Sequence, residues 1–159
     1  MEKIAIFVDV QNIYYTTMSC YKAHFDYNVF WRKVTHGREV VKAIAYAIDR
    51  GDEKQRQFQN ILRGIGFEVK LKPYIQRKDG SAKGDWDVGI TIDIMSYAPL
   101  TDTVILASGD GDFDLLMAKV NQSGHTQTEV YGVEALTAKS LQHSATKYIP
   151  IQSDLLLNK

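Results

Sequence analysis

The sequence predicts an α/β fold in which a mostly parallel sheet carries helices on both faces. Strand-like and helical segments alternate along the chain, which is the pattern of parallel strands joined by crossover helices. The segment Thr103–Ala107 (TVILA) is almost wholly apolar, as expected of a strand that is covered on both sides. The chain has 159 residues, of which 45% are hydrophobic, and this suits one domain with its own core.

The predicted strands are short runs that are apolar or alternate between apolar and polar residues. The first run ends directly before Asp9 and the second directly before Asp49. The third contains a proline, which suits an edge strand or a strand end. In chain order the strands are expected at Lys3–Val8, Lys42–Ile48, Glu68–Tyr74, Thr103–Ala107, Thr128–Gly132 and Lys147–Ile149.

The predicted helices have apolar residues three or four positions apart. In the helix expected over Trp86–Ala98, one face carries Val88, Ile92 and Met95, and Ile90 and Ile94 lie beside it. Another helix is expected to start near Asn12. The remaining helices are expected at Glu53–Gly64, Asp112–Ser123 and Ala135–His143.

The composition points to a single domain in a reducing compartment. The single Cys20 excludes an internal disulfide framework and a cysteine-rich zinc site. Neither a signal peptide nor a long apolar run is recognisable, so we expect a cytoplasmic protein without a membrane partner. Lysine plus arginine and aspartate plus glutamate both total 19, so the net charge does not indicate a partner. We expect one domain over residues 1–150.

Residues 151–159 are expected to form a C-terminal tail. The apolar residues Leu155, Leu156 and Leu157 in this tail suit either a docking surface or packing within the chain. The oligomeric state is left open, and a homodimer is one of the alternatives.

A cluster of acidic residues follows the predicted strand at Thr103–Ala107. Asp110, Asp112 and Asp114 occupy alternate positions in SGDGDFD, and Asp9 follows the first strand. Aspartates at this place can cap a helix. However, the carboxyl ends of parallel strands share one crevice, so Asp9 and Asp110 are expected to meet there. Several carboxylates would repel each other unless a cation lies among them, so we predict a metal site.

The type of ligand restricts the metal. The four histidines lack zinc spacing, and all-oxygen ligands suit Mg²⁺, Mn²⁺ or Ca²⁺. An EF-hand loop is excluded, because Leu115 and Asn121 stand where its glycine and glutamate are required. Haloacid-dehalogenase phosphatases also have a DxD motif at the end of a strand. In them it is the first strand, whereas here the motif comes late in the chain, so a phosphatase is a weaker alternative.

Two further segments contain candidate site residues. Asn12 follows Asp9 in VDVQN, and it can either cap the next helix or bring an amide to the crevice. In KGDWDVGITID, Asp85 and Asp87 lie at the expected start of a helix, where the helix dipole also explains them. Asp93 is six residues beyond Asp87 and therefore points to a different face of that helix.

Together, VDVQN, KGDWDVGITID and LASGDGDFDLL resemble the motifs of the NYN domain family, in its LabA-like branch within the PIN-like nuclease superfamily. The resemblance extends from Lys3 to about Ile149. It implies a Rossmann-like three-layer α/β/α sandwich and a metal-dependent ribonuclease site with Mg²⁺ or Mn²⁺.

The resemblance also implies roles for individual residues. Asp9, Asp87, Asp110 and Asp112 would hold the metal and take part in catalysis, and Asn12 and Ser108 would orient ligands or water. One extra residue separates Lys83 from Asp87, so Asp85 is a rival for the third acid. In some related PIN-like nucleases the last two acids are four residues apart, and this spacing favours Asp114 over Asp112 as a ligand. The motif also includes Gly109, Gly111 and Phe113, which we expect to allow a tight turn and to pack inward.

The expected substrate is RNA, most simply in single-stranded form. The basic stretch at residues 70–86 contains Lys83, Arg77 and Lys78, which could bind phosphates, and Trp86, which could stack on a base. A solvated hairpin-like loop is the alternative for this stretch. Tyr14 and Tyr15 could stack on a base near Asp9 or lie in the core. The alternative function is an NYN-type RNA-binding or regulatory domain with little or no catalysis.

Overall fold

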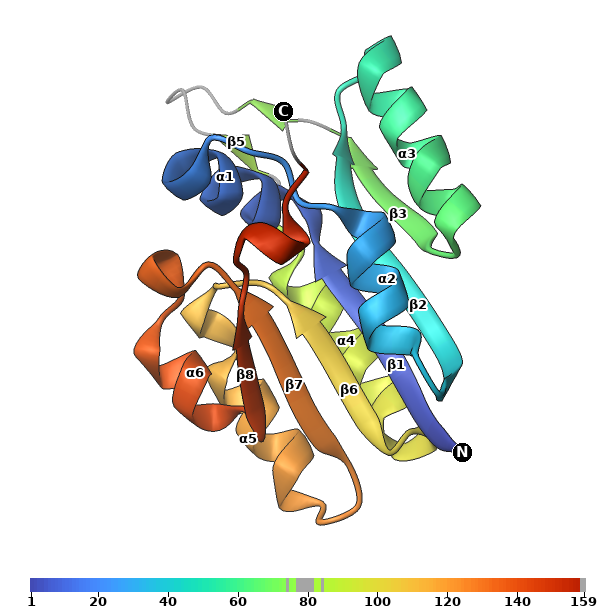
Figure 1. Cartoon of the computed structure of the whole chain (residues 1–159), viewed down its shortest axis with the longest axis vertical. Helices are drawn as coiled ribbons and strands as arrows, with labels where there is room; N and C mark the ends of the chain where they lie inside the picture. The colour runs from blue at the N-terminus through green and yellow to red at the C-terminus, as the bar shows by residue number, and fades with distance from the viewer. Residues whose placement is uncertain (74, 77–81, 84, 158–159) are drawn as a thin grey trace.

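A six-stranded sheet lies between two layers of helices (Figure 1). The computed structural model describes residues 1–73, 75–76, 82–83 and 85–157. The strand order is β3-β2-β1-β6-β7-β8, and all neighbouring strands in this sheet are parallel. The predicted α/β/α sandwich with a parallel central sheet is therefore confirmed.

The six strands of this sheet coincide closely with the predicted runs. The second begins at Arg38 rather than Lys42, and its register against the first shifts between Ile4 and Ala5. A separate small sheet pairs β4 (Ile75–Gln76) with β5 (Ala82–Lys83) in antiparallel fashion. The main strands are β1 (Glu2–Asp9), β2 (Arg38–Asp49), β3 (Glu68–Pro73), β6 (Thr103–Ala107), β7 (Gln127–Gly132) and β8 (Lys147–Pro150).

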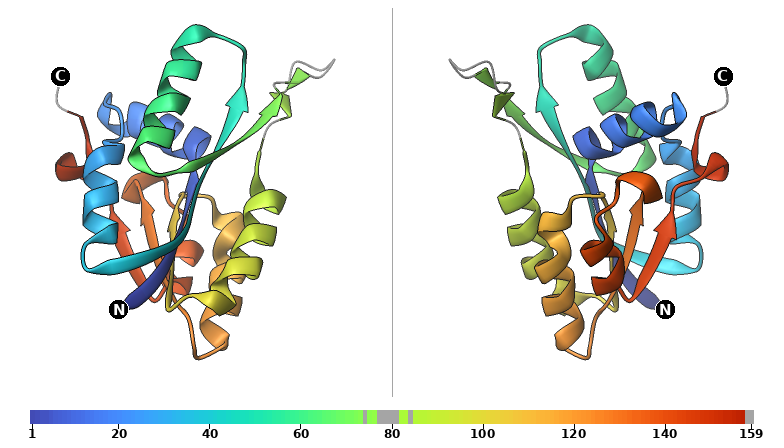
Figure 2. Two further views of the ribbon diagram at one scale, coloured as in Figure 1. Left: turned by 90° about the vertical axis from the view of Figure 1, so that its right-hand side faces the viewer. Right: turned by 90° about the vertical axis from the view of Figure 1, so that its left-hand side faces the viewer.

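The helices are divided between the two faces of the sheet (Figure 2). One face carries α1 (Val10–Tyr21), α2 (Tyr27–Thr35) and α3 (Glu53–Ile65). The other face carries α4 (Asp87–Tyr97), α5 (Asp114–Gln122) and α6 (Lys139–Ser144). Short 3₁₀ turns complete the fold: η1 (Ala98–Leu100), η2 (Gly111–Phe113), η3 (Glu134–Leu136) and η4 (Ser153–Leu155).

The alternation of side chains along β1 links the sheet to both layers. Ile4, Ile6 and Val8 pack in the core beneath α1 and α2, whereas Ala5 and Phe7 pack in the core beneath α4 and α5. All five are fully buried. The sequence of such a central strand is a continuous apolar run, because both of its faces are covered.

Helix α2 was not predicted from the hydrophobic pattern. Its start has a clear local signal, since a carboxylate oxygen of Asp26 accepts a hydrogen bond from the backbone N–H of Val29. Its buried face consists of Tyr27, Phe30 and Val34, spaced three and four residues apart. Aromatic and β-branched residues are modest helix formers, and tertiary packing rather than propensity stabilises this helix.

The orientation of α4 was not decided by its apolar pattern. Ile90 and Ile94 are fully buried, whereas Val88, Ile92 and Met95 are exposed. On the buried side of the helix, a carboxylate oxygen of Asp93 lies 2.8 Å from the Tyr46 hydroxyl and 2.8 Å from the Lys70 ammonium group. These bonds connect the side of α4 that carries Asp93 to β2 and β3.

Two predicted helices are interrupted. The segment expected to be helical from Asp112 begins with the 3₁₀ turn η2, and regular α-helix starts only at Asp114. The segment expected at Ala135–His143 divides into η3 and α6. Between them, the hydroxyl of Thr137 donates a hydrogen bond to the backbone oxygen of Val133, and Thr137 itself has extended backbone angles.

The predicted C-terminal tail packs against the core. Ile151 and Leu155 are fully buried beside α1 and α2. The backbone N–H of Asp26 donates to the oxygen of Leu155, and the N–H of Leu157 donates to the oxygen of His24. The alternatives for this apolar segment were a docking surface and packing within the chain. Leu155 packs within the chain. Among the described residues, no helix is long and apolar enough to cross a bilayer.

We expect Leu155→Ala to lower the free energy of unfolding by about 2 to 4 kcal/mol, because it removes a fully buried side chain. Leu157→Ala is the matched control: this side chain is 48% exposed, and its loss should change the free energy by less than about 0.5 kcal/mol. Urea denaturation of both variants measures the difference. Equal effects of the two substitutions would show that the tail is not part of the core.

Candidate metal centre

The candidate site lies where the strand order reverses. β2 and β3 lie on one side of β1, and β6, β7 and β8 lie on the other. Asp9 is the last residue of β1, and Asp110 follows closely after β6. In open parallel sheets, ligands bind in the crevice at the carboxyl ends of the strands beside this reversal. The topology therefore brings together two acids that are distant in the sequence.

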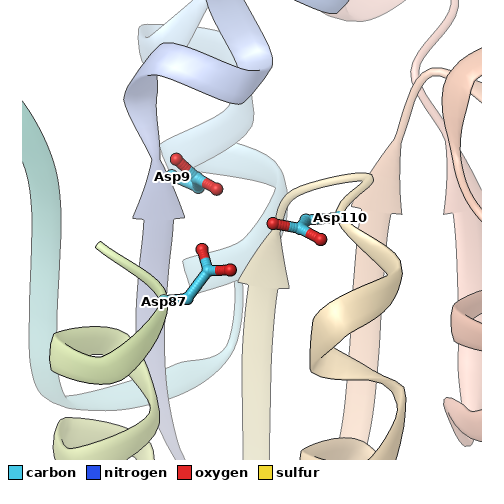
Figure 3. A group of neighbouring side chains, drawn as sticks. All are labelled: Asp9, Asp87 and Asp110. Atoms are coloured by element: carbon cyan, nitrogen blue, oxygen red, sulfur yellow. The ribbon is translucent and has the colours of Figure 1, made fainter. Parts of the chain in front are cut away.

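A third acid arrives from the helix that covers the other face. Asp87 is the first residue of α4, and its side chain points towards Asp9 and Asp110 (Figure 3). One carboxylate oxygen from each of these three residues lies within 4.8 Å of the other two. Asp9 is buried, and Asp87 and Asp110 are half-buried. The expected meeting of Asp9 and Asp110 is thus observed, with Asp87 as their neighbour.

Each of the three acids lies at the start of a helix. Asp9 directly precedes α1, Asp87 begins α4, and Asp110 precedes η2, where its carboxylate accepts a hydrogen bond from the backbone N–H of Asp112 at 2.9 Å. The free N–H groups of a helix start favour negative charge. Helix capping and cation binding were alternative interpretations of Asp110. Its carboxylate caps η2 and also lies in the group of three acids that could bind a cation.

Polar side chains connect the ends of β1 and β6. The Ser108 hydroxyl is fully buried and donates to a carboxylate oxygen of Asp9 at 3.1 Å. The same hydroxyl oxygen accepts the backbone N–H of Asp110 at 3.2 Å. The side-chain oxygen of Asn12 accepts the N–H of Gly109 at 2.8 Å. Ser108 and Asn12 thus link the end of β1 and the start of α1 to the segment after β6.

At Gly109 and Gly111 there is no room for a side chain. Neither has a positive φ, so the tight turn expected from the sequence does not explain them. A Cβ atom on Gly109 would lie 2.9 Å from the backbone oxygen of Leu136. One on Gly111 would lie 2.8 Å from the Cβ of Ala138. The loop after β6 therefore lies directly against the segment between η3 and α6.

Trp86 anchors the start of α4. Its indole N–H donates to the backbone oxygen of Ala47 at 2.9 Å, and its ring packs on Tyr46 with centroids 5.3 Å apart. The Lys72 ammonium group lies 4.5 Å from the centroid of the Trp86 ring and donates to the backbone oxygen of Asp85 at 3.0 Å. Trp86, predicted to stack on a base, is half-buried, contacts β2 and directly precedes Asp87.

The remaining acids of the cluster lie apart from the three carboxylates. Asp112 is exposed, and a carboxylate oxygen of Asp114 accepts the backbone N–H of Leu115 at 2.6 Å at the start of α5. In the described part of the chain, neither belongs to a group of three neighbouring metal-ligating side chains. Phe113 is buried in the core beneath α5, as expected. Asp93 lies away from the site and binds Tyr46 and Lys70, as expected from its helical face.

The predicted phosphate-binding residues Arg77, Lys78 and Lys83 belong to a stretch that the structure describes only in part. Arg77 and Lys78 lie outside the described residues. The backbone of Lys83 belongs to β5, and its side chain is not described. The short antiparallel pair β4–β5 is consistent with the hairpin-like alternative for this stretch.

Burial and neighbouring negative charges raise the pKa values of two of these carboxylates, Asp9 and Asp87. Burial raises the pKa of Asp9 from 3.8 to about 6; the Ser108 hydroxyl and the nearby backbone amide of Asn12 lower it, and the charges of Asp110 and Asp85 raise it. Burial and the Asp110 carboxylate also raise the pKa of Asp87 well above its usual range. Asp9 and Asp87 therefore bind a proton more readily than an ordinary aspartate does, and a nearby positive charge would favour their ionised forms.

These features fit a divalent cation. The donor atoms are carboxylate oxygens, which Mg²⁺ and Mn²⁺ prefer in proteins. The three oxygens come from separate elements and lie close together, and burial and neighbouring carboxylates raise the pKa values of Asp9 and Asp87. The group could bind a divalent metal, and its chemistry suits a metal-dependent nuclease.

The pocket around these acids also contains residues that the sequence did not assign to the site. It has a volume of about 300 Å³ and is lined by Asp9, Gln11, Asn12, Tyr15, Asp85, Asp87 and Asp110. Gln11 was missed and Tyr15 was left undecided. Their spacing of four residues places both on one face of α1, directly after Asp9, and this was the available signal. Asp85 lines the pocket, and its carboxylate accepts the N–H of Asp87 at 3.3 Å.

Comparison with protein families identifies similar sequences. The NYN domain matches residues 3–154 of the chain. The low amplitude and bright protein LabA of Synechococcus elongatus is 26% identical over 162 residues, which covers 94% of this chain and 83% of that protein. The resemblance inferred from the three motifs is thus confirmed over nearly the whole chain.

Solved structures show the same fold. A protein of unknown function from Vibrio parahaemolyticus is 58% identical, with a TM-score of 0.93 over 98% of this chain and 96% of that one. A carbohydrate kinase from Agrobacterium tumefaciens is 12% identical, with a TM-score of 0.51 over 93% of this chain and 60% of that one. The kinase shares only the general α/β arrangement.

We expect Asp9→Asn to stabilise the metal-free protein at pH 8. Because the folded protein raises the pKa of Asp9, it binds more protons than the unfolded chain between about pH 4 and 6, and its stability falls as the pH rises through this range. Removing the charge should raise the free energy of unfolding by up to about 3 kcal/mol at pH 8 and by little at pH 4. Urea denaturation in EDTA measures this difference.

Asp154→Asn is the control for this measurement. Asp154 is exposed and forms a long ion pair with Lys33 at 3.7 Å, so its effect should be below about 0.5 kcal/mol at both pH values. If Asp9→Asn instead destabilised the protein equally at pH 4 and pH 8, the carboxylate of Asp9 would not carry an uncompensated charge.

Proposed function

The chain belongs to the NYN domain family, and from this membership and its three converging carboxylates we propose that it is a metal-dependent ribonuclease that hydrolyses phosphodiester bonds in RNA. The observation that carries the proposal is the group of Asp9, Asp87 and Asp110, whose oxygens lie within 4.8 Å of one another. A purely structural role would not require three acids with uncompensated charge at the end of a parallel sheet.

We propose that Asp9, Asp87 and Asp110 hold Mg²⁺ or Mn²⁺. In such a site a divalent ion neutralises charge on the phosphoryl group and lowers the pKa of water. Ser108 keeps the Asp9 carboxylate in position through its hydrogen bond, and Asn12 holds the adjacent Gly109. Since the acids come from β1, α4 and the loop after β6, the site depends on the folded sheet.

Asp112 and Asp114 take secondary roles in this proposal. They follow Asp110 by two and four residues, and the backbone N–H of Asp112 donates a hydrogen bond to the Asp110 carboxylate. Both add negative charge near the site without joining the group of three. Substrate binding through Lys83, Arg77, Lys78 and Trp86 remains a proposal, in which Trp86 acts chiefly by fixing the start of α4.

The activity is tested with a labelled single-stranded RNA in Mn²⁺. We expect wild-type protein to cleave it, EDTA to stop cleavage, and Asp110→Asn to reduce the rate by at least about 100-fold, since loss of outer ligands alone often costs 10- to 100-fold. Calorimetric titration with Mn²⁺ should show weaker binding in the same variant. Asp154→Asn, which is exposed and lies in η4, should keep both cleavage and Mn²⁺ binding.

The outcomes separate the alternatives. Cleavage that survives both EDTA and Asp110→Asn would contradict the metal-dependent mechanism. RNA binding without cleavage at any metal concentration would favour the RNA-binding or regulatory alternative. Hydrolysis of a phosphomonoester without cleavage of RNA would favour a phosphatase.

A further inference from the structure

One side of the acidic pocket is formed by helix α1. Gln11 and Tyr15 line the pocket together with the three carboxylates, and both side chains are exposed. They are four residues apart and therefore lie one above the other on the same face of the helix. Side chains of a helix lean towards its N-terminus, so the ring of Tyr15 extends towards the end of α1 that follows Asp9.

Tyr15 has no structural role among the described residues. It is 67% exposed, and within the described ranges neither a hydrogen bond nor a ring contact involves it. Its neighbour Tyr14 is also exposed but stacks on His24, with ring centroids 5.8 Å apart and planes at 26°. Tyr21, at the end of the helix, donates its hydroxyl hydrogen to the backbone oxygen of Ile151. Tyr15 thus has a free aromatic ring at the mouth of the pocket.

The charges around the pocket restrict what can contact this ring. The acids of the pocket attract a phosphate only through a bound cation. Of the lysines on β3, Lys70 pairs with Asp93 and Lys72 contacts Trp86 and Asp85. The side chains that line the pocket from α1 are the aromatic ring of Tyr15 and the amides of Gln11 and Asn12, and the Asn12 oxygen already binds the Gly109 N–H. These groups suit a nucleobase, which stacks on aromatic rings and forms hydrogen bonds through its edge.

We propose that Tyr15 stacks on the base next to the phosphate at the acidic site, that Gln11 hydrogen-bonds to the same nucleotide, and that the substrate must therefore be unpaired at this position. The inference rests on the proposed function, since it places the substrate of that site. A base inside a duplex is stacked on both faces and cannot lie on a side chain in this way. Tyr15 acts as a specificity residue that selects single strands, and the metal-binding carboxylates act on the phosphate.

The test measures binding of a short fluorescein-labelled oligouridylate in Ca²⁺, and cleavage of the same RNA in Mn²⁺. We expect Tyr15→Ala to weaken binding of the single strand by about 5- to 100-fold, the range found for loss of one stacked base. Tyr15→Trp should bind within about threefold of wild type, because an indole also stacks. The oligouridylate annealed to its complement should bind equally to wild type and Tyr15→Ala.

Tyr14→Ala is the matched control, since Tyr14 is an exposed tyrosine on the same helix that does not line the pocket. It should bind the single strand as wild type does. Circular dichroism and Mn²⁺ binding confirm that each variant is folded with its acidic site intact.

The two possible failures are distinguishable. If wild type cleaves and binds the single strand, and Tyr15→Ala binds it equally well, the stacking role is overturned while the proposed ribonuclease activity stands. If Tyr14→Ala weakens binding as much as Tyr15→Ala, the specific role of Tyr15 is likewise overturned. If wild type neither binds nor cleaves RNA, the proposed function fails and the inference fails with it.

Discussion

Mutual repulsion among Asp9, Asp87 and Asp110 is the constraint around which the structure is organised. Three carboxylate oxygens lie within 4.8 Å of one another, and burial raises the pKa of Asp9 to about 6. The fold reduces this repulsion by placing each acid at the start of a helix, where backbone N–H groups favour negative charge. The buried Ser108 hydroxyl adds a hydrogen bond to Asp9. A bound cation would compensate the remaining negative charge, as the proposed function requires.

The parallel sheet brings these acids together, and a second set of contacts sets their directions. The reversal of strand order places the ends of β1 and β6 side by side. Helix α4 is oriented by the bonds of Asp93 to Tyr46 and Lys70 and by the bond from Trp86 to Ala47. These contacts lie outside the pocket, on or next to the helix that brings Asp87 towards Asp9 and Asp110. A substitution among them would act on the site through the position of α4.

Helix α1 connects the chemistry of the site to the choice of substrate. Asp9 precedes its first turn, Asn12 in that turn holds the loop after β6, and Tyr15 follows one turn later at the mouth of the pocket. The end of β1 and the first turns of α1 therefore place a candidate metal ligand, a hydrogen-bonding amide and the proposed base-stacking ring close together in the chain. Because their spacing is set by the helix, a nucleotide bound to the ring has a defined position relative to the acids.

The sequence by itself determined the α/β class, the positions of the main strands, the family and the set of acids from which the site is drawn. These follow from local signals: apolar runs, helical spacing and short motifs around Asp9, Asp87 and Asp110. Only the tertiary structure decided that these three converge while Asp112 and Asp114 lie apart, that Tyr15 rather than Tyr14 lines the pocket, and that Leu155 is buried. The physical reason is that periodicity defines the faces of an element, whereas contacts between distant residues, such as that of Asp93 with Tyr46, decide which face turns inward.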